Sequence, residues 1–246
     1  MDMKLSGSGV ITAGDYEKVR ICGSGKMDGL VRCDSLHISG SVNGCELQCR
    51  EDVIISGSMR LDGNLTADEM ETGGSVSIDG DCKVKNEIKC SGSARIEGAV
   101  KCGKLCTSGS IDVTKGIEAE EIKIFGSVYC GDLMNAEKIN IETKPQSKVN
   151  IESIGGNSIS IYRNSCKRKS LISRLPLLSR IIGSSGGTAV IKNYIEGDTV
   201  AVEGVKAKSV TGRIVTIGED CKIDLVQYSE QIEIHPKAKV GRQEKI

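Results

Sequence analysis

Eleven cysteines are the first residues of this sequence that suggest chemistry, because thiols pair as disulfides and bind zinc. They include two Cys-x3-Cys pairs, Cys45/Cys49 and Cys102/Cys106, with no histidine nearby. The total is odd, and no secretory signal precedes the first repeat. We therefore expect free, reduced thiols that pack as small hydrophobic side chains, and no metal or cofactor. The cysteines expected in apolar slots of the repeat are Cys33, Cys82, Cys102, Cys130 and Cys221.

Two histidines are the remaining candidates for acid–base chemistry. His37 lies between two apolar residues that are expected to point inward, so its own ring should point to solvent. His235 precedes Pro236 at an expected bend. Neither has an acid or nucleophile at a fixed spacing, and no phosphate-binding loop or paired-carboxylate motif occurs. The sequence therefore predicts that this protein is not an enzyme.

Acidic residues before glycine recur at one position of the repeat, at Asp28, Asp62, Asp79 and Glu97. An acidic residue followed by glycine indicates a turn, in which glycine supplies the positive φ angle. Stacked repeats would align these acids along one edge, and a cation-binding ladder is one interpretation. The favoured interpretation is that they are solvated turn residues.

The dipeptide Gly-Ser marks the elements that position all of these residues. It occurs eight times within residues 7–127, with steps of 16, 17, 17, 17, 18, 17 and 17 residues. A fixed short period is the signature of a solenoid. The first residues of the pairs are Gly7, Gly23, Gly40, Gly57, Gly74, Gly92, Gly109 and Gly126.

Apolar residues follow each of these glycines as three pairs, and the two members of a pair are two residues apart. That spacing places both side chains on one face of a strand. One coil then holds three short strands and three bends, which predicts an all-β, triangular parallel β-helix of about a dozen coils, roughly 60 Å long. The scarcity of aromatic residues fits a narrow interior. The inward residues should include Val113, Ile117, Ile122, Ile124, Val128, Ile139, Ile217, Ile223 and Ile234.

The pattern divides the chain into N-terminal coils over 1–161, an insertion over 162–188 and C-terminal coils over 189–246. Charge is uneven between the parts: residues 1–152 carry 18 Lys and Arg against 24 Asp and Glu, whereas residues 153–195 carry 7 basic residues and no acid. The insertion is therefore expected to have a function of its own.

The insertion combines a basic cluster with an apolar stripe at helical spacing, interrupted by Pro176. A loop or short helix of this composition is typical of interfacial membrane binding. Packing of the stripe against the solenoid or against a partner protein is equally favoured by the sequence. The expected contact residues are Arg163, Lys167, Arg168, Lys169, Leu171, Ile172, Arg174, Leu175, Leu178, Arg180, Ile181 and Ile182.

The Gly-Ser coils with two aliphatic residues per strand resemble the bactofilins, over residues 5–141 and more weakly over 189–240. The resemblance implies a right-handed β-helix that polymerises end to end without nucleotide. It also implies a cytoplasmic location at the inner face of the cell membrane, and scaffolding of envelope, shape or motility machinery. Envelope or flagellar proteins would then be partners, and nucleic acid would not.

The terminal coils are expected to form the polymer contacts, because few residues flank them and an uncapped coil leaves a sheet edge unpaired. The alternative is a monomeric or oligomeric adaptor that binds a protein partner through the insertion. The residues assigned to the polymer ends are Ile11, Ile21, Ile234 and Val240.

Overall fold

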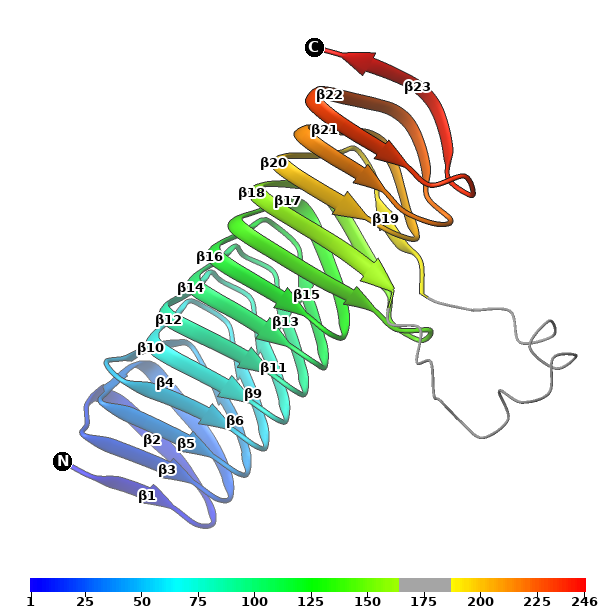
Figure 1. Cartoon of the computed structure of the whole chain (residues 1–246). Helices are drawn as coiled ribbons and strands as arrows, with labels where there is room; N and C mark the ends of the chain where they lie inside the picture. The colour runs from blue at the N-terminus through cyan, green and yellow to red at the C-terminus, as the bar shows by residue number, and fades with distance from the viewer. Residues whose placement is uncertain (164–186) are drawn as a thin grey trace, which may run out of the picture.

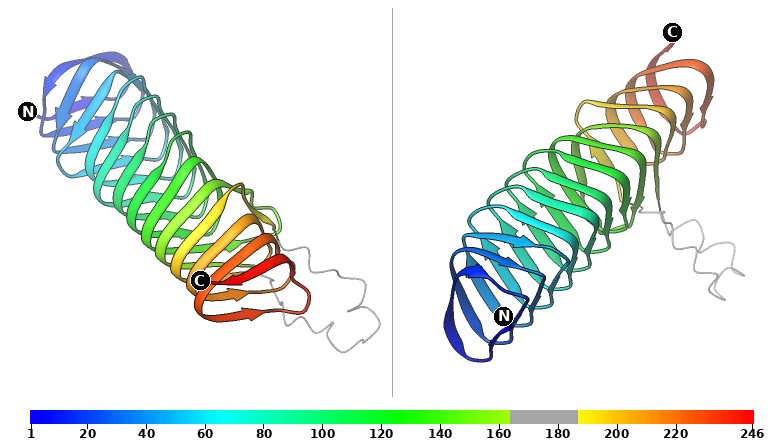
Figure 2. Two further views of the ribbon diagram at one scale, coloured as in Figure 1. Left: turned by 90° about the horizontal axis from the view of Figure 1, so that it is seen from above. Right: turned by 90° about the vertical axis from the view of Figure 1, so that its left-hand side faces the viewer.

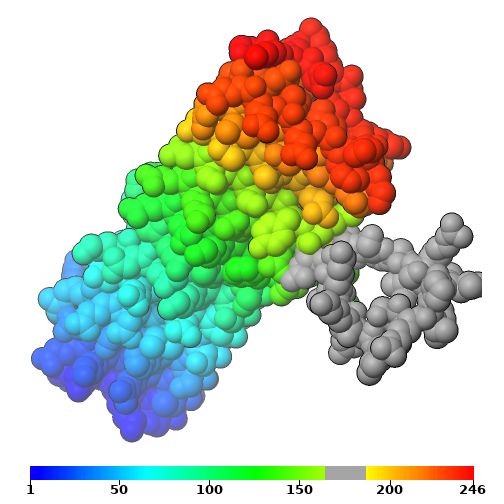
Figure 3. Space-filling view, viewed as in Figure 1, coloured from blue at the N-terminus to red at the C-terminus, as the bar shows by residue number. Residues whose placement is uncertain are grey.

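Each apolar pair forms one short strand segment, and three such segments make one turn of a parallel β-solenoid (Figure 1). The computed structural model describes residues 1–163 and 187–246, which form about 13 turns that repeat every ~17 residues and contain no helix. Figure 2 shows the turns stacked along one axis, and Figure 3 shows an elongated rod with the first and last turns at opposite ends. The predicted fold class is confirmed.

The strands follow one another along the chain, and several run around one or two bends of a turn. They are β1 (Met3–Leu5), β2 (Ser8–Asp15), β3 (Lys18–Ile21), β4 (Ser24–Cys33), β5 (Ser35–Ile38), β6 (Ser41–Gly44), β7 (Glu46–Cys49), β8 (Asp52–Ile55), β9 (Ser58–Leu61), β10 (Leu65–Thr72), β11 (Ser75–Ile78), β12 (Cys82–Cys90), β13 (Ser93–Ile96), β14 (Val100–Thr107), β15 (Ser110–Val113), β16 (Ile117–Ile124), β17 (Ser127–Thr143), β18 (Val149–Arg163), β19 (Ala189–Ile191), β20 (Tyr194–Val202), β21 (Val205–Ile217), β22 (Lys222–Ile234) and β23 (Lys239–Lys245).

The three faces of the rod are numbered from the corner at which Gly-Ser occurs, called the Gly-Ser corner below. In the turn that starts at Gly57, face 1 is β9, face 2 is residues 65–67 and face 3 is residues 69–72. Every strand pair is parallel, and each residue stacks on its counterpart in the next turn; Ser58, for example, aligns with Ser75 and Ser75 with Ser93. The spacing between stacked turns is about 4.8 Å.

The core is a single column of aliphatic side chains and thiols inside the triangle. The predicted inward residues are buried, with the exception of Ile234, which is half-buried because it lies in the last turn. In the coil from Gly40, Leu47 and Cys49 point inward and Gln48 and Arg50 point outward, as a bend one residue shorter requires. Burial of aliphatic side chains in stacked turns is therefore what holds the rod together.

The Gly-Ser corner is too tight for any side chain at the glycine position. A Cβ atom on Gly74 would lie 1.9 Å from the carbonyl oxygen of Gly57, and one on Gly57 would lie 1.9 Å from the oxygen of Gly40. The same carbonyls accept hydrogen bonds from the serine of the following turn, as in the 2.9 Å bond from Ser75 N to Gly57 O. Glycine is therefore required because two backbones approach closely, and the recurring Gly-Ser dipeptide indicates a closely stacked corner.

The corner that follows face 1 corrects one expectation. Gly29 has a positive φ of 99°, but Gly63, Gly80 and Gly98 do not adopt positive φ. A Cβ on Gly98 would lie 2.3 Å from the oxygen of Gly80, so close packing is again the reason for glycine here. Arginines pair with three of the acids before these glycines: Arg60 with Asp62 and with Asp79, where Nη2 lies 2.7 Å from Oδ2, and Arg95 with Glu97, where Nε lies 2.8 Å from Oε1.

Candidate functional site

The two ends of the rod are open sheet edges within the described residues. At one end β1 pairs only with β3, and β2 pairs only with β4. At the other end β23 pairs only with β22, and residues 231–234 of β22 pair only with β21. Unpaired backbone donors and acceptors on such an edge are a template for pairing with another chain.

Partly exposed core residues gather at these same ends. Nine apolar residues are half-buried against the core, and all except Ala119 lie in the terminal turns. Leu5 bends over the first turn, where its Cδ1 atom would lie 2.8 Å from a Cβ on Gly9. The half-buried residues at the N-terminal end are Met3, Leu5 and Tyr16, and those at the C-terminal end are Tyr228, Ile232, Ile234, Ala238 and Val240.

The residues assigned to the N-terminal polymer end lie inside the first turn. Ile11 and Ile21 are fully buried, and Ile21 lies in β3, which has β1 on one side and β5 on the other. Their side chains fill the core and are not presented to a neighbour. At the C-terminal end, Ile234 and Val240 lie half-buried in the edge strands, where the sequence placed them.

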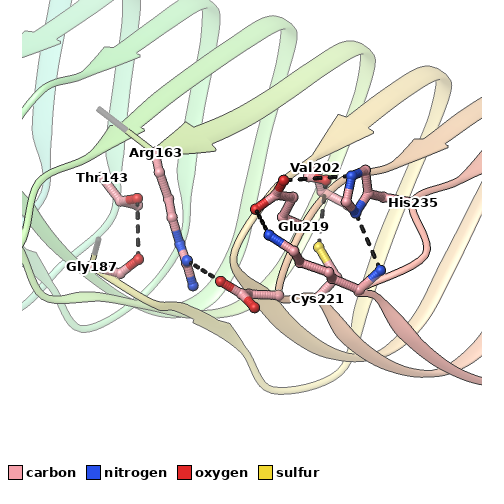
Figure 4. A network of polar contacts seen from close by, with 9 residues as sticks. Thr143, Arg163, Gly187, Val202, Glu219, Cys221 and His235 are labelled. Carbon is pink, nitrogen blue, oxygen red and sulfur yellow. Dashed lines mark hydrogen bonds and ion pairs between the residues drawn. The ribbon is translucent and has the colours of Figure 1, made fainter. Parts of the chain in front are cut away.

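The two attachment points of the insertion lie at the Gly-Ser corner, where β18 ends at Arg163 and the chain re-enters at Gly187 (Figure 4). The Thr143 hydroxyl donates to the carbonyl oxygens of Tyr162, at 3.3 Å, and of Gly187, at 3.4 Å. A Cβ on Gly187 would lie 2.3 Å from the Lys144 oxygen, so only glycine fits at the re-entry. The described ends of the insertion are thus held by the turn before it.

Arg163 spans the corner from β18 to the turn between β21 and β22. Its Nη1 atom donates to Asp220 Oδ2 at 2.6 Å, and only 11% of its side chain is exposed. Gly204, with a φ of 64°, lies beneath it: a Cβ there would be 2.1 Å from Arg163 Nε. Asp220 has a φ of 56°, the left-handed conformation that aspartate tolerates better than most residues. Figure 4 shows this arginine stretched along the corner.

Arg163, one of the predicted contact residues, has its guanidinium engaged within the solenoid. The other predicted contact residues lie outside the described residues, and their role stays a prediction. These are Lys167, Arg168, Lys169, Leu171, Ile172, Arg174, Leu175, Leu178, Arg180, Ile181 and Ile182.

The histidines have acidic partners that the sequence analysis missed. His37 Nε2 lies 2.8 Å from Asp52 Oδ2, and His235 Nε2 lies 3.5 Å from Glu219 Oε1, which belongs to a cluster with Lys237. Both partners come from a neighbouring turn, about one period away in the sequence. A search for acidic residues about one period before or after each outward histidine would have found them.

The thiols of the core are poor candidates for chemistry. Burial raises the pKa of Cys82 to about 12 and that of Cys102 to about 12, so neither is a thiolate at neutral pH. Of the two Cys-x3-Cys pairs, Cys45 is exposed while Cys49 is buried, and Cys102 is buried while Cys106 is half-buried. Across residues 1–163 and 187–246, no three His, Cys, Asp or Glu side chains are grouped to hold a metal ion. The same residues contain no helix long and apolar enough to cross a membrane.

Comparisons with known proteins agree with the repeat. The family model described as bactofilin, polymer-forming cytoskeletal, matches residues 3–83, about a third of the chain. The uncharacterized protein YhbE of Bacillus subtilis (strain 168) is 42% identical over 52 residues, which cover 21% of this chain and 22% of that protein. The chain thus spans about a fifth of the curated relative it matches. No solved structure matches it.

The match to the family model ends near β12, but the stacked turns continue beyond it. Leu65 in the matched part aligns with Cys82, Cys82 with Val100 and Val100 with Ile117, in one unbroken register. The matched third and the later turns are therefore one solenoid. The match of residues 3–83 to the bactofilin family model confirms the family resemblance that the Gly-Ser coils indicated.

Proposed function

We propose that this protein is a structural, non-enzymatic scaffold that assembles end to end into a cytoskeletal polymer. The observation that carries the proposal is the position of the apolar residues half-buried against the core, which among the described residues lie in the terminal turns with the exception of Ala119. These residues lie beside unpaired strand edges, so stacking one rod on another would extend both the sheets and the core. The polymer-forming description of the matched family supports the same conclusion.

The assembly test compares two apolar residues of similar burial, Ile234 in the last turn and Ala119 in the middle of the rod. Electron microscopy of purified wild type should show filaments. Ile234→Lys places a charge in the end contact and should leave monomers or short oligomers, whereas Ala119→Lys should still form filaments. Circular dichroism checks that both variants keep their strands.

Two outcomes would contradict the assembly proposal. Wild-type protein that stays monomeric at high concentration would favour an adaptor that binds a partner through the insertion. Equal loss of filaments in both variants would mean that the terminal turns have no special role.

We further propose that the polymer attaches to the inner face of the cell membrane through residues 162–188, and so positions envelope, shape or motility proteins. Each lysine or arginine near an anionic leaflet contributes ~1 kcal/mol, and a polymer repeats the contact once per subunit. Arg163 is excluded from this count because it pairs with Asp220.

Vesicle co-sedimentation tests the attachment with two charge-matched variants. Leu175→Glu/Leu178→Glu changes the apolar stripe and should abolish binding to anionic vesicles. Ser170→Glu/Ser173→Glu adds the same charge off the stripe and should weaken binding much less. If both pairs bind as wild type does, the insertion is not the attachment site.

A further inference from the structure

Three lysines form an in-register column on face 1 of the last turns. Lys206 aligns with Lys222, and Lys222 aligns with Lys239. All three are exposed, and the residues on either side of Lys206 and Lys222 are buried, so the lysines point outward. Neighbouring turns are about 4.8 Å apart, so three like charges are stacked at that spacing. We call Lys206, Lys222 and Lys239 the lysine column.

The lysine column lacks the partners that the arginines of the same outward column have in earlier turns. None of its ammonium groups makes an ion pair or hydrogen bond with a described residue. In the same outward column of earlier turns, Arg60 pairs with Asp79 and Arg95 pairs with Glu97. Stacked like charges destabilise a sheet, and no ion pair with a described residue offsets the repulsion within the column. A partner that carries several negative charges would offset it.

The neighbours of the column keep this face basic. Lys208 Nζ lies 3.1 Å from Asn193 Oδ1, an uncharged partner. Lys192 pairs with Glu152 at 2.8 Å, and Asp224 is exposed two residues after Lys222. Lysine thus outnumbers carboxylate around the column, and an anionic partner is favoured.

The same outward column contains exposed apolar groups towards the middle of the rod. Tyr129 aligns with Asn150, Asn150 with Val190, and Val190 with Lys206. Tyr129 is 38% exposed and Val190 37% exposed, two of the few large apolar side chains that are exposed among the described residues. A flat sheet face that combines a tyrosine, an aliphatic side chain and unpaired lysines fits the interface of a lipid bilayer.

A second copy of the chain fits the column less well. The stacked carboxylates of face 3 are Asp52, Glu69 and Glu87, but His37 already contacts Asp52, and Lys104 and Lys89 contact Glu87. The attachment points of the insertion, Arg163 and Gly187, lie at the corner that borders face 1. A bilayer lying against face 1 would therefore lie close to both the attachment points of the insertion and the lysine column.

We propose that face 1 of the last turns, through Lys206, Lys222 and Lys239, lies against an anionic phospholipid surface. This inference rests on the proposed membrane attachment, to which it adds a second contact on the solenoid itself. The rod would then lie along the membrane, with face 3 and face 2 free for other contacts.

The test replaces the column by threonine, which suits an exposed strand position, in Lys206→Thr/Lys222→Thr/Lys239→Thr. The matched control, Lys18→Thr/Lys83→Thr/Lys115→Thr, removes three exposed lysines that also lack ion pairs with described residues. Both are compared with wild type by co-sedimentation with vesicles of phosphatidylcholine alone and with added phosphatidylglycerol. Electron microscopy establishes that the proteins compared are in the same assembly state.

Each lysine near an anionic surface changes the binding constant about fivefold, so the column variant should lose about a hundredfold in affinity for phosphatidylglycerol vesicles. The control variant should change far less, and neither should affect the weak binding to phosphatidylcholine. The column variant should also melt no lower than wild type, because the substitution removes repulsion.

Each other outcome has a defined meaning. Equal losses in both lysine variants would show that only net charge matters and would overturn the inference. If Leu175→Glu/Leu178→Glu abolishes binding while the column variant binds as wild type does, the membrane attachment stands and the role of face 1 falls. If wild type ignores both kinds of vesicle, the proposed attachment itself fails. Column-dependent binding of soluble polyphosphate without vesicle binding would assign the column to a linear polyanion and overturn the lipid proposal.

Discussion

The first eight turns and the last five share the same strand register, but their connections at the corner between face 3 and face 1 differ. In seven of the first eight, glycine fills the corner and a Cβ atom would meet the backbone of the preceding turn at about 2 Å, as for Gly109 against Gly92. In the last five, the connections at this corner vary: residues 144–148 and the insertion are long, whereas only residues 203–204 join β20 to β21. The long connections thus occur where the Gly-Ser contact is absent.

The charges follow the same division. In the middle turns, Glu87 contacts Lys89 and Lys104, and Glu121 contacts Lys123. In the last turns, the lysine column has no partner among the described residues, while Arg163 and Asp220 connect turns across the corner. The middle turns thus contain several paired charges, whereas the lysine column of the last turns leaves three stacked charges available for binding.

The largest effect is expected from a side chain placed in the glycine corner. Gly74→Ala puts a Cβ where the Gly57 oxygen lies 1.9 Å away, so two turns must separate. We expect a loss of about 3 kcal/mol in the free energy of unfolding, at the upper end for overpacking. Chemical denaturation measures it.

The control for this substitution is the preceding residue. A Cβ atom on Gly73 would meet no other atom within 4 Å, and Gly73 has no positive φ. Gly73→Ala should therefore be neutral or stabilising by up to about 1 kcal/mol. Equal stability of the two variants would show that the corner is not closely packed and would remove the explanation of the Gly-Ser marker.

An intermediate effect is expected at the corner of the last turns. Asp220→Ala removes the partner of the largely buried Arg163 guanidinium and puts alanine at a φ of 56°. We expect a loss of about 2 kcal/mol, from the unpaired charge and the strained backbone together. Asp220→Gly also removes the carboxylate but relieves the strain, so it should lose about 1 kcal/mol.

Hydrogen exchange would show which strands are destabilised by Asp220→Ala. Amides of β20 to β22 should exchange faster than in wild type, while those of β9 to β13 should not change. Faster exchange along the whole rod would indicate that the ion pair supports all turns alike, against the division drawn above.

Much of this fold was predictable from the sequence, and the exceptions have definite causes. The period and the paired aliphatic residues predicted that Val113, Ile117 and Ile122 point inward, because alternation along a strand is local. The contact between His37 and Asp52 needed the stacking of two turns. The pair of Arg163 and Asp220 could not be predicted from the period, because the insertion between them breaks the count.

The candidate site was less predictable than the fold for a related reason. The composition of residues 162–188 indicated a binding segment, but the lysine column consists of ordinary residues spaced by one turn, 16 and 17 apart. Only the register shows that Lys206, Lys222 and Lys239 share a column without counter-charges. Residue types alone do not reveal that these lysines align across turns.

The smallest expected effect concerns the self-neutralised charges of the middle turns. The hydrogen bond from Lys104, with a second from Lys89, lowers the pKa of the Glu87 carboxyl below its ordinary value of 4.5. A carboxyl whose pKa is lower in the folded state contributes stability above its unfolded pKa and loses it as the pH falls through the folded value. Glu87→Gln should therefore be less stable than wild type at neutral pH, and this difference should shrink as the pH falls below the ordinary carboxyl range.

The matched control is Glu233→Gln in the last turns, because Glu233 is exposed and makes no ion pair with a described residue. Its stability should follow that of wild type at both pH values, as the contrast between paired and unpaired charges requires. Denaturant midpoints at neutral pH and at about pH 3 measure both variants. A deficit of Glu87→Gln that persists at the lower pH would assign the effect to packing. The charge network would then not be what distinguishes the middle turns from the last ones.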